Sequence, residues 1–77
     1  MHPVWLTAFP MSDKYTFQRI VRKQRRGASD DEISDLLDEV SGGKAHRIRA
    51  FAEDESAENL VKEFQRHGGS AEVREAE

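Results

Sequence analysis

The stretch SDDEISDLLDEV, from Ser29 to Val40, carries the clearest helix signal in the chain and decides the fold class. It begins with a capping box, in which Ser29 at the N-cap is followed three residues later by Glu32. Apolar residues then recur at helical spacing, at Ile33, Leu36, Leu37 and Val40. The segment SGGK follows, and its glycines favour the end of a helix. We therefore expect an amphipathic helix that covers a core with one face.

A second helix is predicted immediately before this one, within DKYTFQRIVRKQRRG, residues 13–27. Ser12 or Asp13 can cap its start, and Gly27 can end it in the left-handed conformation that glycine adopts without strain. An apolar stripe at i, i+3, i+4 and i+7 marks the buried face: Phe17, Ile20, Val21 and Gln24.

The remaining segments predict three strands and one further helix. The strands are HPVWLTAFP (2–10), AHRIRAFAE (45–53) and SAEVREAE (70–77), and a helix from about Ser56 to the glycines at 68–69 separates the last two. The order β-α-α-β-α-β predicts a single small α+β domain over residues 1–77. Its three-stranded sheet would have three helices packed on one face. The expected core is Val4, Leu6, Phe17, Ile20, Val21, Ile33, Leu36, Leu37, Val40, Ile48, Leu60, Val61, Phe64 and Val73.

Composition narrows the class of protein. A chain of 77 residues is near the small end of domains that fold without disulfides or metals, and it has no cysteine for either purpose. No segment approaches the roughly 18 apolar residues of a membrane span, and the N-terminus lacks the order of a signal peptide. We therefore expect a cytoplasmic domain that contacts no membrane.

Catalytic chemistry is not indicated by the sequence. His2, His46 and His67 are far apart and lack the spacing of a metal site. The glycine pairs follow helices instead of leading from a strand into one, so they do not form phosphate-binding loops. We expect no catalytic residue, no metal ligand and no cofactor.

The helix of residues 13–27 holds six of the chain's twelve Lys and Arg residues, although the formal net charge is -3. At about 100° per residue, four of its side chains fall within about 60° on the face opposite the apolar stripe: Tyr15, Arg19, Arg22 and Arg26. Lys23 and Arg25 flank them. The helix dipole explains basic residues in the last turn, but it does not explain Tyr15 or Arg19. Because Tyr and Arg often anchor interfaces, this face is a candidate contact surface.

Two alternatives use other partners. Nucleic acid, RNA in particular, could bind the same basic helix, but residues 30–39 carry six acids and no base, and the pI is near 5.6. The second alternative is a homodimerising regulatory protein that pairs through the open sheet face, where Trp5, Phe9 and Phe51 would be uncovered.

Four segments in the same order resemble the C-terminal domain of the bacterial large-subunit ribosomal stalk protein: PVWLTAF (3–9), DKYTFQRIVR (13–22), ISDLLDEV (33–40) and AENLVKEFQRHGGSAEV (57–73). That family has the β-α-α-β-α-β fold, which the ClpS adaptors share. The asparagine and paired aspartates that mark ClpS after its first strand are absent from FPMSDK, residues 9–14, so capture of N-terminal degrons is not expected.

The resemblance implies recruitment of a translational GTPase through the first two helices. By position, the implied contact residues are Lys14, Tyr15, Thr16, Arg19 and Arg22. With the flanking Lys23 and Arg26, they form the expected partner-binding set. We accordingly expect a non-catalytic protein-protein interaction module, monomeric or weakly dimeric, that docks an acidic protein such as a translation factor through its basic first helix.

Overall fold

A computed structural model describes residues 1–74 of this chain and confirms the predicted order of elements. A short 3-10 turn, η1, lies between the first strand and the first helix. The elements are β1 (His2–Ala8), η1 (Met11–Asp13), α1 (Lys14–Gln24), α2 (Asp30–Ser41), β2 (His46–Phe51), α3 (Asp54–Arg66) and β3 (Ser70–Val73). The last predicted strand extended to residue 77, and its residues 75–77 lie outside the described part of the chain.

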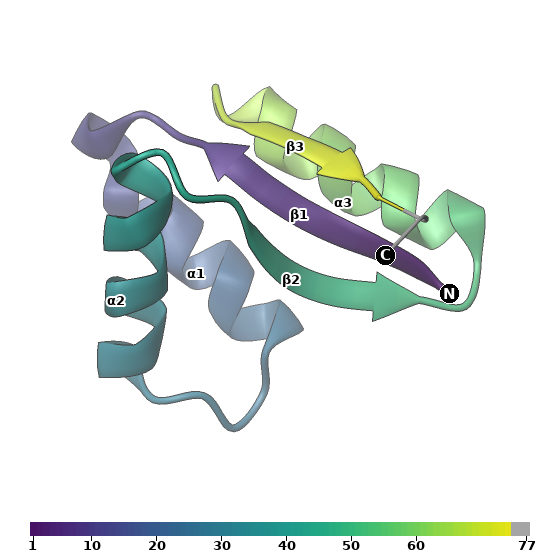
Figure 1. The fold of residues 1–77 in the computed structure, drawn as a ribbon, viewed down its shortest axis with the longest axis horizontal. Helices are drawn as coiled ribbons and strands as arrows, with labels where there is room; N and C mark the ends of the chain where they lie inside the picture. Colours follow the sequence, from purple (N-terminus) through teal and green to yellow (C-terminus); the bar gives the residue numbers. More distant parts are fainter. Residues whose placement is uncertain (75–77) are drawn as a thin grey trace.

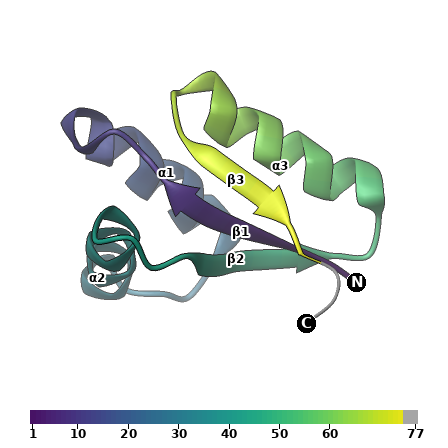
Figure 2. The same ribbon diagram turned by 45° about the horizontal axis from the view of Figure 1, so that its top comes forward.

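The three strands form one antiparallel sheet with the order β2-β1-β3. In Figure 1 the helices α1 and α3 lie behind the sheet, and α2 lies at the end where β1 finishes. The view in Figure 2 shows the same arrangement, with the opposite face of the sheet left without a helix. The fold is therefore α+β, with the helices packed on one face of a three-stranded sheet.

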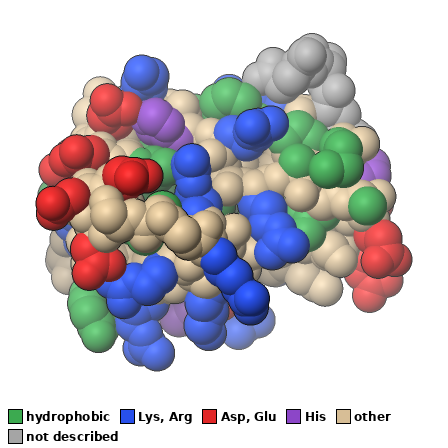
Figure 3. Space-filling model, turned by 90° about the horizontal axis from the view of Figure 1, so that it is seen from below, with side chains coloured by type: hydrophobic (Ala, Val, Ile, Leu, Met, Phe, Trp, Pro, Cys, Tyr) green, Lys and Arg blue, Asp and Glu red, His purple; other side chains and the backbone are tan. Residues whose placement is uncertain are grey.

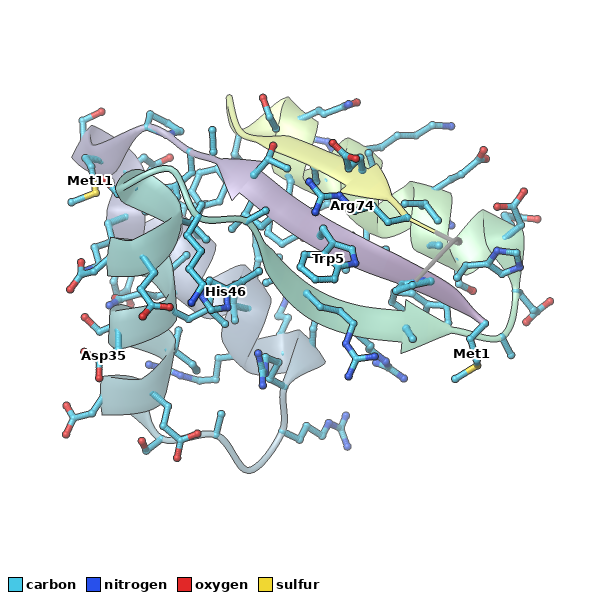
Figure 4. The ribbon with its side chains drawn as sticks, in the orientation of Figure 1. Met1, Trp5, Met11, Asp35, His46 and Arg74 are labelled. Atoms are coloured by element: carbon cyan, nitrogen blue, oxygen red, sulfur yellow. The ribbon has the colours of Figure 1, made fainter. Side chains whose placement is uncertain are left out.

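The alternation of β1 divides its side chains between these two faces. Val4 and Leu6 are completely buried against the helices. Trp5 lies on the open face, where its side chain projects toward the viewer in Figure 4. Its indole Nε1 is buried and makes no hydrogen bond within residues 1–74. The register of β1 shifts between Val4 and Trp5 against β2, and between Leu6 and Ala8 against β3.

The core is built around three aromatic rings from different parts of the chain. Phe17 of α1 is stacked on Phe64 of α3 with ring centroids 5.9 Å apart and an interplanar angle of 6°. The ring of Phe9 also packs on Phe17, with ring centroids 5.3 Å apart and an interplanar angle of 33°. The buried apolar residues are Val4, Leu6, Phe9, Phe17, Ile20, Val21, Ile33, Leu36, Leu37, Val40, Ile48, Ala57, Leu60 and Phe64.

Phe9 is the main correction to the sequence-based core. We expected it on the uncovered sheet face, but it is only 9% exposed and packs on Phe17. The alternation is already lost inside β1: Ala8 is exposed although it stands two residues after the buried Leu6, and the pairing with β3 shifts register between these two residues. Val61 and Val73 were expected in the core and are half-buried at its margin, as is Phe51.

The helix ends agree with the predicted signals in part. The hydroxyl of Ser29 accepts a hydrogen bond from the backbone N–H of Glu32 at 3.1 Å, which confirms the N-cap of α2. Gly27 has the predicted left-handed conformation, with φ of 91°, but α1 already ends at Gln24. The third helix begins at Asp54, two residues before the predicted start.

The glycine pair after α3 serves two separate purposes. Gly68 has a φ of 90°, which turns the chain after the helix. Gly69 has no positive φ, but a Cβ placed there would lie 2.6 Å from Cε2 of Phe17. The absence of a side chain at Gly69 therefore lets β3 approach the aromatic core.

Candidate docking surface on the first helix

The exposed face of α1 follows directly from its amphipathic sequence. Phe17, Ile20 and Val21 are buried, so the residues on the opposite side of the helix face solvent. Tyr15 is 69% exposed, the most exposed aromatic side chain within residues 1–74. The guanidinium carbon of Arg19 lies 5.9 Å from the centroid of its ring, within the range of a cation–π contact.

Two of the predicted contact residues are held by the neighbouring helix. The ammonium group of Lys14 lies 2.7 Å from a carboxylate oxygen of Asp38 and donates to the hydroxyl of Ser34 at 3.1 Å. Arg22 forms an ion pair with Asp30, with Nη2 and Oδ1 2.6 Å apart. Both bases therefore contribute to the contact between α1 and α2, and their charges are offset within the domain.

Thr16 has a local role at the start of α1. Its hydroxyl donates a hydrogen bond to the carboxylate of Asp13 at 2.6 Å, which joins the first turn of the helix to its N-cap residue. Thr16 also lines a shallow hollow between α1 and α3. The lining of this hollow of about 230 Å³ also includes Arg19, Lys23 and His67, together with one carboxylate, that of Glu63.

The other predicted bases remain available to a partner. Arg19, Lys23 and Arg26 are exposed, and none of them forms an ion pair with another residue between positions 1 and 74. Tyr15, Arg19 and Lys23 follow one another on the solvent side of α1 at i, i+4 and i+8, and Arg26 lies just beyond the end of the helix. We call these four residues the α1 stripe.

The basic surface extends beyond α1. Figure 3 shows Lys and Arg side chains gathered on the side that is lowermost in Figure 1, next to a group of Asp and Glu side chains. Arg25 and Arg49 line one hollow together with Lys23 and Arg26. The sequence prediction placed Arg25 only at the flank and did not include Arg49. The signal that was available was the alternation in HRIRAF, residues 46–51, which exposes Arg47 and Arg49 around the buried Ile48.

The open sheet face offers less apolar surface than the sequence predicted. Phe9 is buried, and Phe51 is half-buried with the guanidinium of Arg49 4.8 Å from its ring centroid. Trp5 stays on this face, but the guanidinium of Arg74 lies 4.9 Å from its ring centroid, as Figure 4 shows. Arg74 is in turn bound to Glu72 at 3.0 Å.

Two further findings concern other kinds of site. Within residues 1–74, no group of three or more His, Cys, Asp or Glu side chains is arranged to hold a metal ion. No helix in the described part of the chain has the length and apolar character needed to cross a membrane.

Comparisons with known proteins give no relative. No family model, no curated protein and no solved structure matches this chain. The similarity to the stalk-protein domain therefore stays a prediction from the quoted segments, and the function has to be argued from the surface itself.

Proposed function

We propose that this domain is a non-catalytic protein-protein interaction module that docks an acidic protein surface through the α1 stripe. The observation that carries the proposal is the uneven use of charge on α1. The chain has more acids than bases, and α2 beside α1 carries six acids, yet three bases of the stripe have no carboxylate partner among residues 1–74.

The stripe combines the two kinds of side chain that bind partners most effectively. Tyr15 presents a large ring with few rotamers to lose, and Arg19 beside it can form a bidentate contact with a carboxylate. Arg19 and Lys23 need not break an internal ion pair before they bind. In contrast, recruiting Lys14 or Arg22 would sacrifice contacts with Asp38 or Asp30.

The partner that the family resemblance implies is a translational GTPase. The segment DKYTFQRIVR, residues 13–22, carries that part of the resemblance, and it includes Tyr15 and Arg19 of the stripe. An acidic helix or loop on such a protein would complement the charge of the stripe. A long nucleic acid is disfavoured here because it would lie next to the carboxylates of α2.

Charge reversal at Arg19 tests the proposal. Arg19 has no ion pair among the described residues, so Arg19→Glu should leave the unfolding free energy within about 0.5 kcal/mol of the original value. The affinity of this variant for a translational GTPase, measured by calorimetry, should fall at least about tenfold, because the new carboxylate repels the acidic surface that Arg19 would attract. The control is Lys62→Glu on α3, which makes the same charge change beside a different hollow, one that no residue of α1 lines. Equal loss in both variants, or no loss in Arg19→Glu, would refute docking through the stripe.

A further inference from the structure

A second basic feature lies where α1, the connection to α2 and strand β2 meet. Four cationic side chains line one open hollow of about 800 Å³: Lys23, Arg25, Arg26 and Arg49. None of the four forms an ion pair within residues 1–74. Glu32 provides the one carboxylate of the lining.

Two of these guanidinium groups are held in place by neutral acceptors. Arg25 donates from Nη1 to the backbone carbonyl of Arg47 at 3.3 Å, and Arg49 donates from Nη1 to the side-chain oxygen of Gln24 at 3.2 Å. Arg49 also lies over the ring of Phe51. Neutral acceptors orient a guanidinium without cancelling its charge, and they leave most of its five N–H donors free for a ligand.

The dipole of α1 accounts for only part of this cluster. Basic side chains at the C-terminal end of a helix are stabilised by its dipole. This explains Lys23 in the last turn, and also Arg25 and Arg26 just beyond the helix. Arg49 belongs to β2, so the dipole of α1 gives no reason for its place in the sequence. The fold brings it to the hollow from 23 positions after Arg26.

We propose that this hollow binds a small ligand with a chain of phosphate groups, such as an inorganic or nucleoside polyphosphate. Arginine forks match phosphate oxygens in bidentate geometry, and adjacent phosphates carry enough negative charge to offset several cations at once. A single carboxylate would offset one of the four. A long nucleic acid would extend past the hollow to the acids of α2, whereas a short polyphosphate fits inside the basic region. Phosphate binding in this hollow is a separate function from docking through the α1 stripe, although Lys23 and Arg26 belong to both surfaces.

The test is a titration of the isotope-labelled protein, with the side-chain Nε–Hε signals of arginine observed by NMR. Tripolyphosphate should shift the signals of Arg25 and Arg49 saturably, and sulfate at equal ionic strength should shift them far less. The double variant Arg25→Gln/Arg49→Gln should weaken tripolyphosphate binding by about tenfold or more, because it removes hydrogen bonds to a charged ligand. Lys62→Gln on the exposed side of α3 removes one positive charge elsewhere and should change the affinity less than twofold.

Glu32 and Arg19 provide two independent checks. Glu32→Gln removes the carboxylate of the lining and should tighten tripolyphosphate binding. Arg19 lies outside this hollow, so Arg19→Glu should leave tripolyphosphate binding within about twofold while it weakens GTPase docking by at least about tenfold, which separates the two proposals.

The phosphate-chain proposal fails if tripolyphosphate and sulfate shift the same signals equally, or if the double variant binds as tightly as the original protein. A parallel titration with a nucleoside triphosphate shows whether the nucleoside increases the affinity above that of tripolyphosphate. An RNA strand whose affinity exceeds that of tripolyphosphate and grows with length would also overturn the proposal, since the site would then belong to nucleic acid.

Discussion

Replacing Gly69 by alanine should destabilise the domain through one identifiable clash. The added Cβ would lie 2.6 Å from Cε2 and 2.9 Å from Cζ of Phe17, and 3.2 Å from the carbonyl oxygen of Ala8. Carbon atoms in van der Waals contact prefer about 3.5–4.0 Å. The ring of Phe17 has little room to move away, because it is completely buried and packs against the rings of both Phe9 and Phe64.

The size of the effect follows from two opposing contributions. Overpacking of a core usually costs about 1–3 kcal/mol. The loss of glycine's freedom in the unfolded chain returns about 0.4–1 kcal/mol, and Gly69 has no positive φ that alanine would have to adopt. We therefore expect a net loss of about 1–2 kcal/mol in the free energy of unfolding. For a domain of this length, that corresponds to a decrease in Tm of roughly 4–16 °C.

Urea denaturation followed by circular dichroism measures this loss, and two variants identify its cause. Gly42→Ala is the matched control, since its Cβ would meet only the carbonyl oxygens of Glu39 and Asp38 at 3.4 and 3.6 Å. Since Gly42 has a φ of -80°, which alanine adopts without strain, this variant should be more stable than the original by about 0.4–1 kcal/mol. In a Phe17→Leu background, Gly69→Ala should cost less, because leucine lacks the two ring atoms that clash. A Gly69→Ala protein as stable as the original, or an equal cost in both backgrounds, would refute the reasoning.

Three further changes have expected outcomes in the same urea assay. Ser29→Ala should lower the stability by about 1 kcal/mol because it removes the acceptor at the N-cap of α2, whereas Ser41→Ala at the exposed end of that helix should be close to neutral. Leu37→Ala should cost about 2–5 kcal/mol, since the side chain is completely buried and leaves a cavity; a loss below 1 kcal/mol would contradict its place in the core. Arg22→Gln should cost at most about 1 kcal/mol, because the ion pair with Asp30 is solvent-exposed, and the difference should shrink at 1 M salt.

Local patterns explain why most of the fold could be predicted. The apolar residues of α2 repeat at helical spacing over about two turns and are all buried, and its N-cap is the serine that the capping box indicated. The prediction was wrong at Phe9, because the register shift between Leu6 and Ala8 interrupts the alternation of β1 before that residue. It also missed the close approach of Gly69 to Phe17, which depends on how the turn between α3 and β3 lies against α1.

The candidate site depends more strongly on tertiary structure. A helical wheel is sufficient to place Tyr15 and Arg19 on the solvent side, because the wheel needs only the buried face of α1. It cannot show that Lys14 and Arg22 bind Asp38 and Asp30, since those contacts depend on how α2 lies along α1. For the same reason, the presence of Arg49 in the basic hollow follows only from the position of β2 beside the end of α1.

The most direct measurement for the docking function is a map of backbone NMR shifts during titration with a translational GTPase, and separately with a short RNA duplex. The account predicts that the GTPase perturbs Tyr15, Arg19 and Lys23 on α1 and Arg26 just beyond it, with little change at Trp5 on the open sheet face. The RNA duplex should leave Tyr15 and Arg19 unperturbed. Perturbations by the GTPase that centre on Trp5, a response of the stripe to RNA, or no binding of the GTPase at all would contradict the account.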